Sequence, residues 1–243
     1  MRSGCPSRLL PLCTVILIWA SGCASAPVPT EAPRAPEISA EAATRAEQLL
    51  ELGRTVEPDL TGWLVAGAER LDLFLYGLPD RVKSKASLER KIQTVMLSEG
   101  VQAEEVIIED VLRYTVLAVD DPKGTYNIVV ADILERAENR GHVIRKVKNY
   151  WPAGDAYSGI NCALETTEGL LWELQFHTIG SLAATEEGHS LYEEFRLPTT
   201  PLGEKRRLFD EMVERWNWVR IPDGILVPYS VHPKEEIILL HRP

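Results

Sequence analysis

Leu170-Leu-Trp-Glu-Leu-Gln-Phe-His-Thr178 is the stretch of sequence that does most to decide the fold. Polar and bulky apolar residues alternate along it. This alternation is typical of a β-strand, because successive side chains of a strand point to opposite faces of the sheet. One face would carry the polar side chains and the other the apolar ones: Glu173, Gln175 and His177 against Trp172, Leu174 and Phe176. The polar face either lines a cleft or is the solvent-exposed face of a sheet whose other face covers the core.

Helical and strand-like patterns surround this strand in a definite order. In chain order we expect helices over about 39–53, 58–76, 87–98, 125–140, 181–196 and 203–217, and strands over 106–108, 112–119, 142–147, 157–164 and 170–178, with short strands and turns after 221. Helices therefore come first, then a mixed sheet with a crossover helix, then more helices. This order predicts an α/β or α+β fold, a mixed β-sheet flanked by helices.

Composition narrows the classes of partner and metal site. The formal net charge is −10, and without the two arginines of residues 1–22 it becomes 24 − 36 = −12. An acidic chain is repelled by phosphate backbones, which disfavours a nucleic-acid partner. Basic clusters at 145–148 and 205–207 leave RNA as an alternative partner. Only Cys162 lies beyond residue 23, and no Cys/His cluster has the spacing of a zinc site.

The first residues have the features of an export signal. Two arginines precede an apolar run of residues 9–20, and small residues follow it, as in a secretory signal peptide over 1–22. The run is too short to cross a hydrocarbon core of roughly 30 Å as a helix. Ala20-Ser-Gly-Cys23 resembles the lipobox of bacterial lipoproteins, with Cys23 as the lipidated residue, although an ordinary cleaved signal and an uncleaved anchor remain alternatives.

A tether is expected between the lipid and the domain. Residues 23–38 are rich in Pro and Ala, a composition typical of an extended linker. Ala24 follows the cysteine, where an aspartate would suggest retention in the inner membrane. By resemblance, the chain is then held in the cell envelope through its lipid anchor, with the outer membrane favoured. Residues 39–243 form the domain, with helical additions before and after its core motifs at 78–196.

Two short polar runs could take part in phosphate chemistry. In Arg81-Val-Lys-Ser-Lys-Ala-Ser-Leu-Glu-Arg-Lys91, one helix face would carry Lys83, Ser87 and Arg90/Lys91 and present several donors to a polyphosphate. The alternative is a solvated basic helix. Glu109-Asp110 comes just before the predicted strand 112–119. A carboxylate at the end of a strand is a common magnesium ligand in phosphoryl transfer. The alternative is a pair of acidic residues in an exposed turn.

A fourth motif lies in the predicted helix 181–196. His189, Tyr192, Glu193 and Arg196 share one face of that helix. They form either a ligand contact or a structural hydrogen-bond network.

The order of these motifs carries a family resemblance. Six of them follow one another from Leu78 to Arg196: Arg-x-Lys-Ser-x-x-Ser-x-x-x-Lys, Asp-x-x-Arg-Tyr-Thr, Lys-Asn-Tyr-Trp, Tyr-x-Gly-Ile-Asn, Glu-Leu-Gln-Phe-His-Thr and His-x-Leu-Tyr-Glu-x-x-Arg. The set resembles the nucleotidyltransferase (synthetase) domain of the RelA/SpoT family, in its small or toxin-like branches. That family transfers pyrophosphate from ATP to the 3′ hydroxyl of a guanine nucleotide, and relatives use adenosine nucleotides or a tRNA end.

The resemblance implies a role for each matching residue. ATP phosphates would be held by Arg81, Lys83, Ser87 and Lys91. Asp110 would bind Mg²⁺, and Glu173 would bind Mg²⁺ or act as the base on the acceptor hydroxyl. On the acceptor side, Tyr157 would stack on the base, with Lys148, Gln175 and His177 lining the site. ATP and a purine nucleotide, with GDP or GTP favoured, are the implied substrates.

The sequence departs from the family pattern at the acceptor motif. Where the family has Asn-Gly-Tyr-Arg-Ser-Leu-His, this chain has Asp155-Ala-Tyr-Ser-Gly-Ile-Asn161, so the identity of the acceptor stays open. The export signal also conflicts with an ATP-dependent activity, because the periplasm holds little ATP. Three interpretations follow: a pyrophosphokinase that works after delivery into another cell or as a cytosolic precursor, an inactive nucleotide-binding or interaction module, and a structural envelope lipoprotein.

Overall fold

The computed structural model describes residues 37–151, 157–197 and 199–225. All of these belong to one compact unit. The predicted signal peptide, Cys23 and all but the last two residues of the tether lie outside the described residues. So does most of the segment after 221 for which short strands and turns are predicted.

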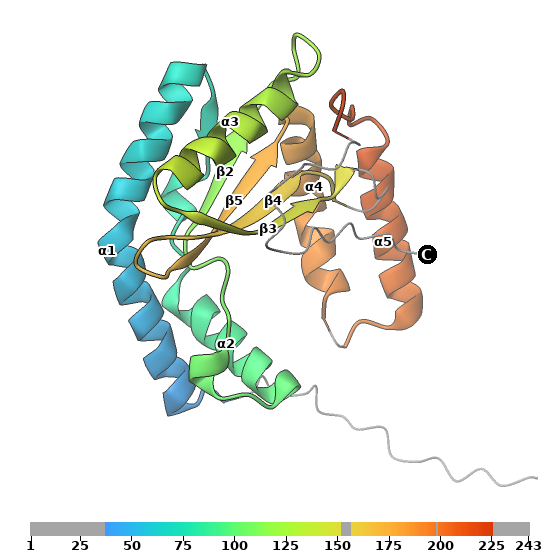
Figure 1. Cartoon of the computed structure of the whole chain (residues 1–243). Helices are drawn as coiled ribbons and strands as arrows, with labels where there is room; N and C mark the ends of the chain where they lie inside the picture. Colours follow the sequence, from blue (N-terminus) through green and yellow to red (C-terminus); the bar gives the residue numbers. More distant parts are fainter. Residues whose placement is uncertain (1–36, 152–156, 198, 226–243) are drawn as a thin grey trace, which may run out of the picture. The chain divides into compact units, whose positions relative to one another are not determined.

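A mixed five-stranded sheet forms the centre of the described part, in the order β1-β2-β5-β4-β3. The strands are β1 (Phe74–Tyr76), β2 (Arg113–Leu117), β3 (Val143–Asn149), β4 (Ile160–Glu165) and β5 (Leu171–His177). The pairing between β2 and β5 is parallel, and the other pairings are antiparallel. Helices flank this sheet in Figure 1, so the predicted α+β class, a mixed sheet flanked by helices, is confirmed.

The two faces of β5 divide as its alternation predicts. Trp172, Leu174 and Phe176 are all 0% exposed and belong to the hydrophobic core. Helix α3 (Thr125–Asn139) contributes Tyr126 to this core, and the Tyr126 hydroxyl donates a hydrogen bond of 2.8 Å to the Phe176 carbonyl. Burial of the apolar face leaves the polar residues of the strand on the opposite side of the sheet.

One helix replaces the two that the sequence predicts before residue 76. Helix α1 runs without interruption over Ala40–Leu71, with Pro58 inside it. A proline inside a helix costs about 3 kcal/mol or more. A stripe of buried side chains continues on both sides of it, including Val56, Leu60 and Leu64, and this burial outweighs the cost. The helix also ends earlier than predicted, because residues 74–76 pair with β2 as strand β1.

Helix α2 (Lys85–Glu99) is confirmed, with its start two residues before the predicted one. The Ser84 hydroxyl caps its first turn, and Gly100 ends it with a φ of 69°, a conformation that glycine adopts without strain. The strand predicted over 106–108 is wrong. Val106 and Ile108 are buried while Ile107 is 69% exposed, so the segment alternates like a strand, yet it pairs with no strand of the described residues.

The last two described helices, α4 (Ile179–Phe195) and α5 (Leu202–Trp216), are both confirmed. They lie side by side at one flank of the sheet in Figure 1. Two short 3₁₀ turns, Leu78–Asp80 and Ala103–Glu105, complete the described elements. Among the described residues, no helix is both long enough and apolar enough to span a membrane.

Candidate functional site

The register of the strands brings the predicted site residues of the sheet onto one face. Residues paired across neighbouring strands point their side chains to the same side. Two such rows cross the sheet: Arg113, Glu173, Ala163 and Lys146 form one, and Thr115, Gln175, Asn161 and Lys148 form the other. Glu173, Gln175 and Lys148 therefore share a polar face, opposite the face that covers the core.

Asp110 lies beside this face and is held by two lysines. Lys83 Nζ donates to its Oδ2 at 2.6 Å, and Lys91 Nζ donates to its Oδ1 at 2.7 Å. Burial alone would raise the pKa of the Asp110 carboxyl, but the two lysine hydrogen bonds outweigh burial and hold the pKa below its ordinary value. Asp110 is therefore an ionised carboxylate at neutral pH.

Lys83 reaches Asp110 from outside the helix on which the sequence places it. Helix α2 begins at Lys85, so the prediction that Lys83 and Lys91 share a face of one helix is wrong. Lys83 instead lies in an extended segment, where its backbone N–H donates to the Val111 carbonyl at 3.0 Å. The isolated bridge between Val82 and Leu112 fixes this segment next to Asp110.

Glu173 is the second carboxylate of the polar face. Its Oε1 accepts a hydrogen bond from Asn161 Nδ2 at 3.3 Å, and its Oε2 accepts one from Gln175 Nε2 at 3.0 Å. Burial raises the pKa of the Glu173 carboxyl, and the negative charge of Asp110 raises it further, against the lowering effect of Arg113. Of the two carboxylates, Glu173 is therefore the more easily protonated one.

The donor set suits a magnesium ion that also binds phosphate. Mg²⁺ takes oxygen ligands and is usually held by one or two carboxylates together with substrate phosphates. Asp110 and Glu173 supply two carboxylates. The described residues contain no group of three or more His, Cys, Asp or Glu that could hold a metal by themselves, so phosphate oxygens and water would complete the coordination.

The other two predicted ATP ligands lie apart from this pair of carboxylates. Arg81 turns towards α1, where its Nε donates to Glu57 Oε1, and its Nη1 donates to the Leu78 carbonyl at 2.7 Å. Ser87 is half-buried in the first turn of α2, and its hydroxyl accepts from Arg90 Nη2 at 3.1 Å. The structure brings Lys83 and Lys91 together, and leaves Arg81 and Ser87 on the flanks.

Tyr157 and His177 meet at the other end of the polar face. The Tyr157 hydroxyl is 2.7 Å from Asn161 Oδ1 and 3.0 Å from His177 Nε2. The Tyr157 ring meets the rings of Tyr150, His177 and Trp216 edge-on, with centroids 5.1 to 6.1 Å apart. Burial raises the pKa of Tyr157 and lowers that of His177 to about 4, so both side chains are neutral at neutral pH.

Three polar residues join the site without having been predicted. Asn161 and Arg113 flank Glu173 across the strands, and Ser181 Oγ lies 2.9 Å from His177 Nδ1. Asn161 could have been found from the alternation of its own strand, which gives the residues at 161, 163 and 165 one common face. Ser181 sits in the first turn of α4, and no sequence pattern points to it.

The fourth motif lies at the surface, where two of its residues form an ion pair. His189, Tyr192, Glu193 and Arg196 all lie on α4 or at its end, and Arg196 Nη2 donates to Glu193 Oε2 at 2.5 Å. Most of this helix face is exposed.

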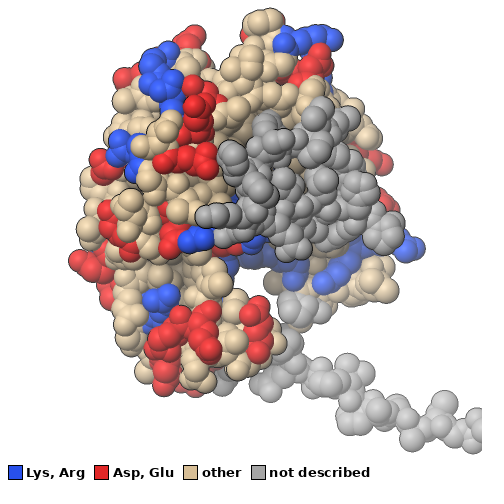
Figure 2. Space-filling view, in the orientation of Figure 1, with Lys and Arg blue, Asp and Glu red and all other residues tan. Residues whose placement is uncertain are grey.

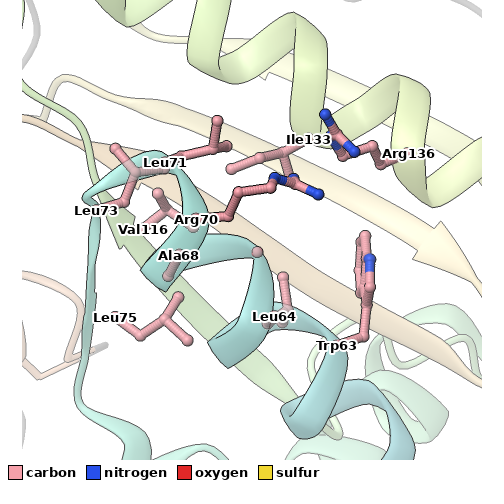
Figure 3. Close-up of a pocket in the computed structure, with 11 residues that line it drawn as sticks. Trp63, Leu64, Ala68, Arg70, Leu71, Leu73, Leu75, Val116, Ile133 and Arg136 are labelled. Atoms are coloured by element: carbon pink, nitrogen blue, oxygen red, sulfur yellow. The ribbon is translucent and has the colours of Figure 1, made fainter.

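A hollow face and an apolar pocket lie in different places. Figure 2 shows a hollow between the α2 side and the α4–α5 side of the molecule, with Lys and Arg atoms along it. The pocket in Figure 3 lies between α1 and α3, and Trp63, Leu64, Val116 and Ile133 line it. Val116 points away from its neighbour Thr115, so this pocket is on the core side of the sheet, and its volume of about 10 Å³ suits no more than one water molecule.

Comparisons with known proteins give similarity to solved structures only. No protein-family model and no curated protein matches the sequence. The Type VI effector Tas1, in complex with its immunity protein, aligns with a TM-score of 0.49 at 18% identity, over 71% of this chain and 95% of that one. Small alarmone synthetase 1 from Bacillus subtilis, bound to its product pppGpp, gives 0.49 at 18% identity over 71% and 91%.

A GTP pyrophosphokinase family protein from Streptococcus pneumoniae aligns with a TM-score of 0.47 at 21% identity, over 72% of this chain and 87% of that one.

Proposed function

We propose that this protein transfers pyrophosphate from ATP to the 3′ hydroxyl of a purine nucleotide, with guanine nucleotides as the favoured acceptors. The observation that carries the proposal is that Asp110, bound by Lys83 and Lys91, lies beside the polar face of Glu173. The Glu173 N–H donates to the carbonyl of Leu112, two residues after Asp110, at 2.9 Å. Carboxylates for a metal next to cations for phosphates are the groups that phosphoryl transfer needs, because the reaction depends on positioning and on neutralised charge.

The donor side is built around Asp110. Lys83 and Lys91 would bind phosphate oxygens of ATP, with Arg81 and Ser87 at the flanks of the same region. Mg²⁺, held by Asp110 either alone or together with Glu173, would supply positive charge next to the phosphates. The lysines would exchange Asp110 for phosphate oxygens when ATP enters, since an ammonium group binds either anion as a point charge.

The acceptor side is built around Glu173. In the transfer, the 3′ oxygen of the acceptor attacks the β-phosphorus of ATP. The bond from that phosphorus to the oxygen that bridges the α- and β-phosphates breaks, and AMP leaves. The proton of the 3′ hydroxyl needs an acceptor, and the raised pKa of Glu173 suits a general base if Asp110 carries the metal. Tyr157 would stack on the acceptor base, while Lys148, Gln175 and His177 line the same side.

A transfer assay tests this proposal. The full-length protein is incubated with γ-labelled ATP, Mg²⁺ and, separately, GDP, GTP, ADP, excess unlabelled ATP or deacylated tRNA. We expect label on a guanine nucleotide first and on an adenine nucleotide second, together with release of AMP. Label on tRNA alone would overturn the choice of acceptor.

Matched variants make the assay specific to the site. Asp110→Asn and Glu173→Gln keep shape and remove charge, and we expect each to reduce transfer by about 10²-fold or more, as for loss of a main electrostatic group. Glu186→Gln, an exposed acid on α4, is the control and should keep full activity. Full activity of Glu173→Gln would remove it from the site.

An inactive nucleotide-binding module is the second candidate. It is favoured by one observation, that both oxygens of Asp110 are already bound by lysines. ATP binding by the wild-type protein without label on any acceptor would support this module, and absence of both would favour a structural envelope protein.

The proposed anchor gives the protein its place in the cell envelope. We infer lipidation at Cys23 from Ala20-Ser-Gly-Cys23, with the outer membrane favoured. Firm anchoring needs more than one acyl chain, which a mature lipoprotein carries. Intact-mass measurement of the protein from the membrane fraction should show the acyl chains on a chain that begins at Cys23, and a mass without lipid would contradict the anchor. ATP would then reach the site after delivery into another cell, or in the cytosol before export.

A further inference from the structure

A continuous chain of side-chain contacts leads from α4 to Glu173. Ser181 Oγ is 2.9 Å from His177 Nδ1, and His177 Nε2 is 3.0 Å from the Tyr157 hydroxyl. The Tyr157 hydroxyl is 2.7 Å from Asn161 Oδ1, and Asn161 Nδ2 is 3.3 Å from Glu173 Oε1. Four contacts thus link a helix terminus to a carboxylate of the proposed site through neighbouring strands.

The donors and acceptors of these bonds follow one direction. The NH₂ group of Asn161 donates to Glu173 Oε1, and the carbonyl oxygen of Asn161 accepts from the Tyr157 hydroxyl. The Tyr157 hydroxyl then donates to Asn161, and its oxygen accepts from His177. His177 therefore carries its proton on Nε2, and its bare Nδ1 accepts from the Ser181 hydroxyl at 2.9 Å. The competing acceptor of that hydroxyl, the Thr178 carbonyl at 3.2 Å, already accepts from the Leu182 N–H at 3.0 Å.

The surroundings hold the chain in place. His177 is 1% exposed and Ser181 is 0% exposed. A Cβ on Gly159 would stand 3.0 Å from His177 Cε1 and 3.1 Å from the Phe176 carbonyl oxygen, so a residue without a side chain allows this close approach. On the far side, Gln175 holds the second oxygen of Glu173 and itself accepts from the Thr115 hydroxyl at 3.3 Å.

We propose that Asn161 is a positioning residue, which fixes the orientation of the Glu173 carboxylate through the directed chain Ser181–His177–Tyr157–Asn161. The proposal rests on the proposed function, because it concerns the geometry in which Glu173 meets its metal or its substrate. An amide suits this position, since it accepts on one side and donates on the other. A carboxylate at 161 could still accept from Tyr157, but it would face Glu173 with a second negative charge.

This chain of hydrogen bonds gives the hydroxyl and the ring of Tyr157 separate roles. Its hydroxyl belongs to the support of Glu173, whereas its ring is the part that would stack on an acceptor base. Groups behind a reacting residue change rates when they are removed, because the reacting group then samples unproductive orientations.

The direction of the chain can be measured without any activity. The protein has five histidines, so ¹⁵N spectra of the full-length protein can assign His177 by comparison with His177→Gln. We expect the neutral tautomer with the proton on Nε2. A proton on Nδ1 in the wild type would overturn the proposed direction, whatever the outcome of the transfer assay.

Kinetics test the positioning role itself. Asn161→Asp is nearly isosteric, and we expect it to lower kcat about 10-fold or more while the KM for ATP stays within about twofold. Tyr157→Phe, which removes only the hydroxyl, should lower kcat as well, and the double variant should be little worse than Asn161→Asp alone, since both break the same chain. Asn139→Asp, an exposed residue at the end of α3, carries the same change of charge and should have no effect.

Two outcomes would overturn the positioning role. One is a double variant whose loss of kcat equals the product of the losses in Asn161→Asp and Tyr157→Phe, because the two residues would then act independently. The other is an unchanged kcat in Asn161→Asp. A wild-type protein without transfer activity would instead refute the proposed function, and the tautomer of His177 would still decide the direction of the chain.

Discussion

Asp110, Lys83 and Lys91 form a cluster that the sequence could predict only in part. The charged residues and their order were visible, and the structure places all three in contact. Their arrangement could not be foreseen, because Lys83 reaches Asp110 from an extended segment that a long-range bridge holds in place. Arg81 was predicted with the same group, but its pairing with Glu57 depends on where α1 packs.

The ring and the hydroxyl of Tyr157 can be separated by substitution. Tyr157→Ala removes the proposed stacking surface, and we expect it to weaken use of the acceptor by about 1–3 kcal/mol, the usual contribution of one base–aromatic stack. Tyr157→Phe keeps the ring, so its KM for the acceptor should stay within about twofold of the wild-type value. Neither change should alter the KM for ATP. Initial rates at varied acceptor concentration measure the difference.

Equal effects of the two variants on the acceptor KM would contradict stacking by the ring. Thermal melts of both variants are the control, because loss of the Tyr157 hydroxyl removes the hydrogen-bond partner of His177 Nε2 and of Asn161 Oδ1 and lowers stability in either case. A variant is compared only at temperatures well below its own transition.

At the scale of elements, local sequence patterns predicted those strands and helices whose ends are set by nearby residues. Strand β5 followed from strict alternation, and α2 and α3 end within a residue of the predicted ends at 98 and 140, each just before a glycine of positive φ, Gly100 and Gly141. Two helices, over about 39–53 and 58–76, are predicted where the structure has the single helix α1 with Pro58 inside it, although proline normally ends a helix. The apolar stripe that overrides it is buried by residues distant in the sequence, so no local rule could weigh the two effects.

The pairing of strands is the part of the site that the sequence left open. Asn161 meets Glu173 only because β4 and β5 pair in one register, in which Asn161 stands opposite Gln175. A slip of one residue would send its side chain to the core side of the sheet. The irregular pairing between Ile144 and Lys146 further shifts the register of β3, which brings Lys146 and Lys148 onto the polar face. A bulge of this kind has no signal in the sequence.

For the whole molecule, net charge and local charge point in different directions. The domain is strongly acidic, yet lysines gather beside Asp110 and Lys and Arg atoms line the hollow in Figure 2. A short polyphosphate needs only such a local group of cations. A long RNA needs an extended positive track, because its binding energy comes from many phosphate contacts. The charge distribution therefore favours a free nucleotide as acceptor.

Stability of the whole molecule should fall when the pH is lowered from 7 towards 4. Burial lowers the pKa of His177 to about 4, and burial together with the nearby Arg140 lowers the pKa of His142, whereas the unfolded imidazoles take up protons near pH 6.5. Between these values the unfolded chain binds more protons, so each pH unit costs up to about 1.4 kcal/mol of stability for each such histidine. Glu173 acts in the opposite sense, because its raised pKa favours the folded state on protonation.

Denaturant titrations of the full-length protein at several pH values between 4 and 7 measure this dependence. The free energy of unfolding should decrease with falling pH, and His177→Gln should have a smaller slope over the same range, even though its stability at pH 7 is lower. His189→Gln, on the exposed face of α4, is the control and should keep the wild-type slope. If His177→Gln kept the full slope, the imidazole of His177 would take up its proton at the same pH in both states, contrary to its burial beside Tyr157 and Ser181.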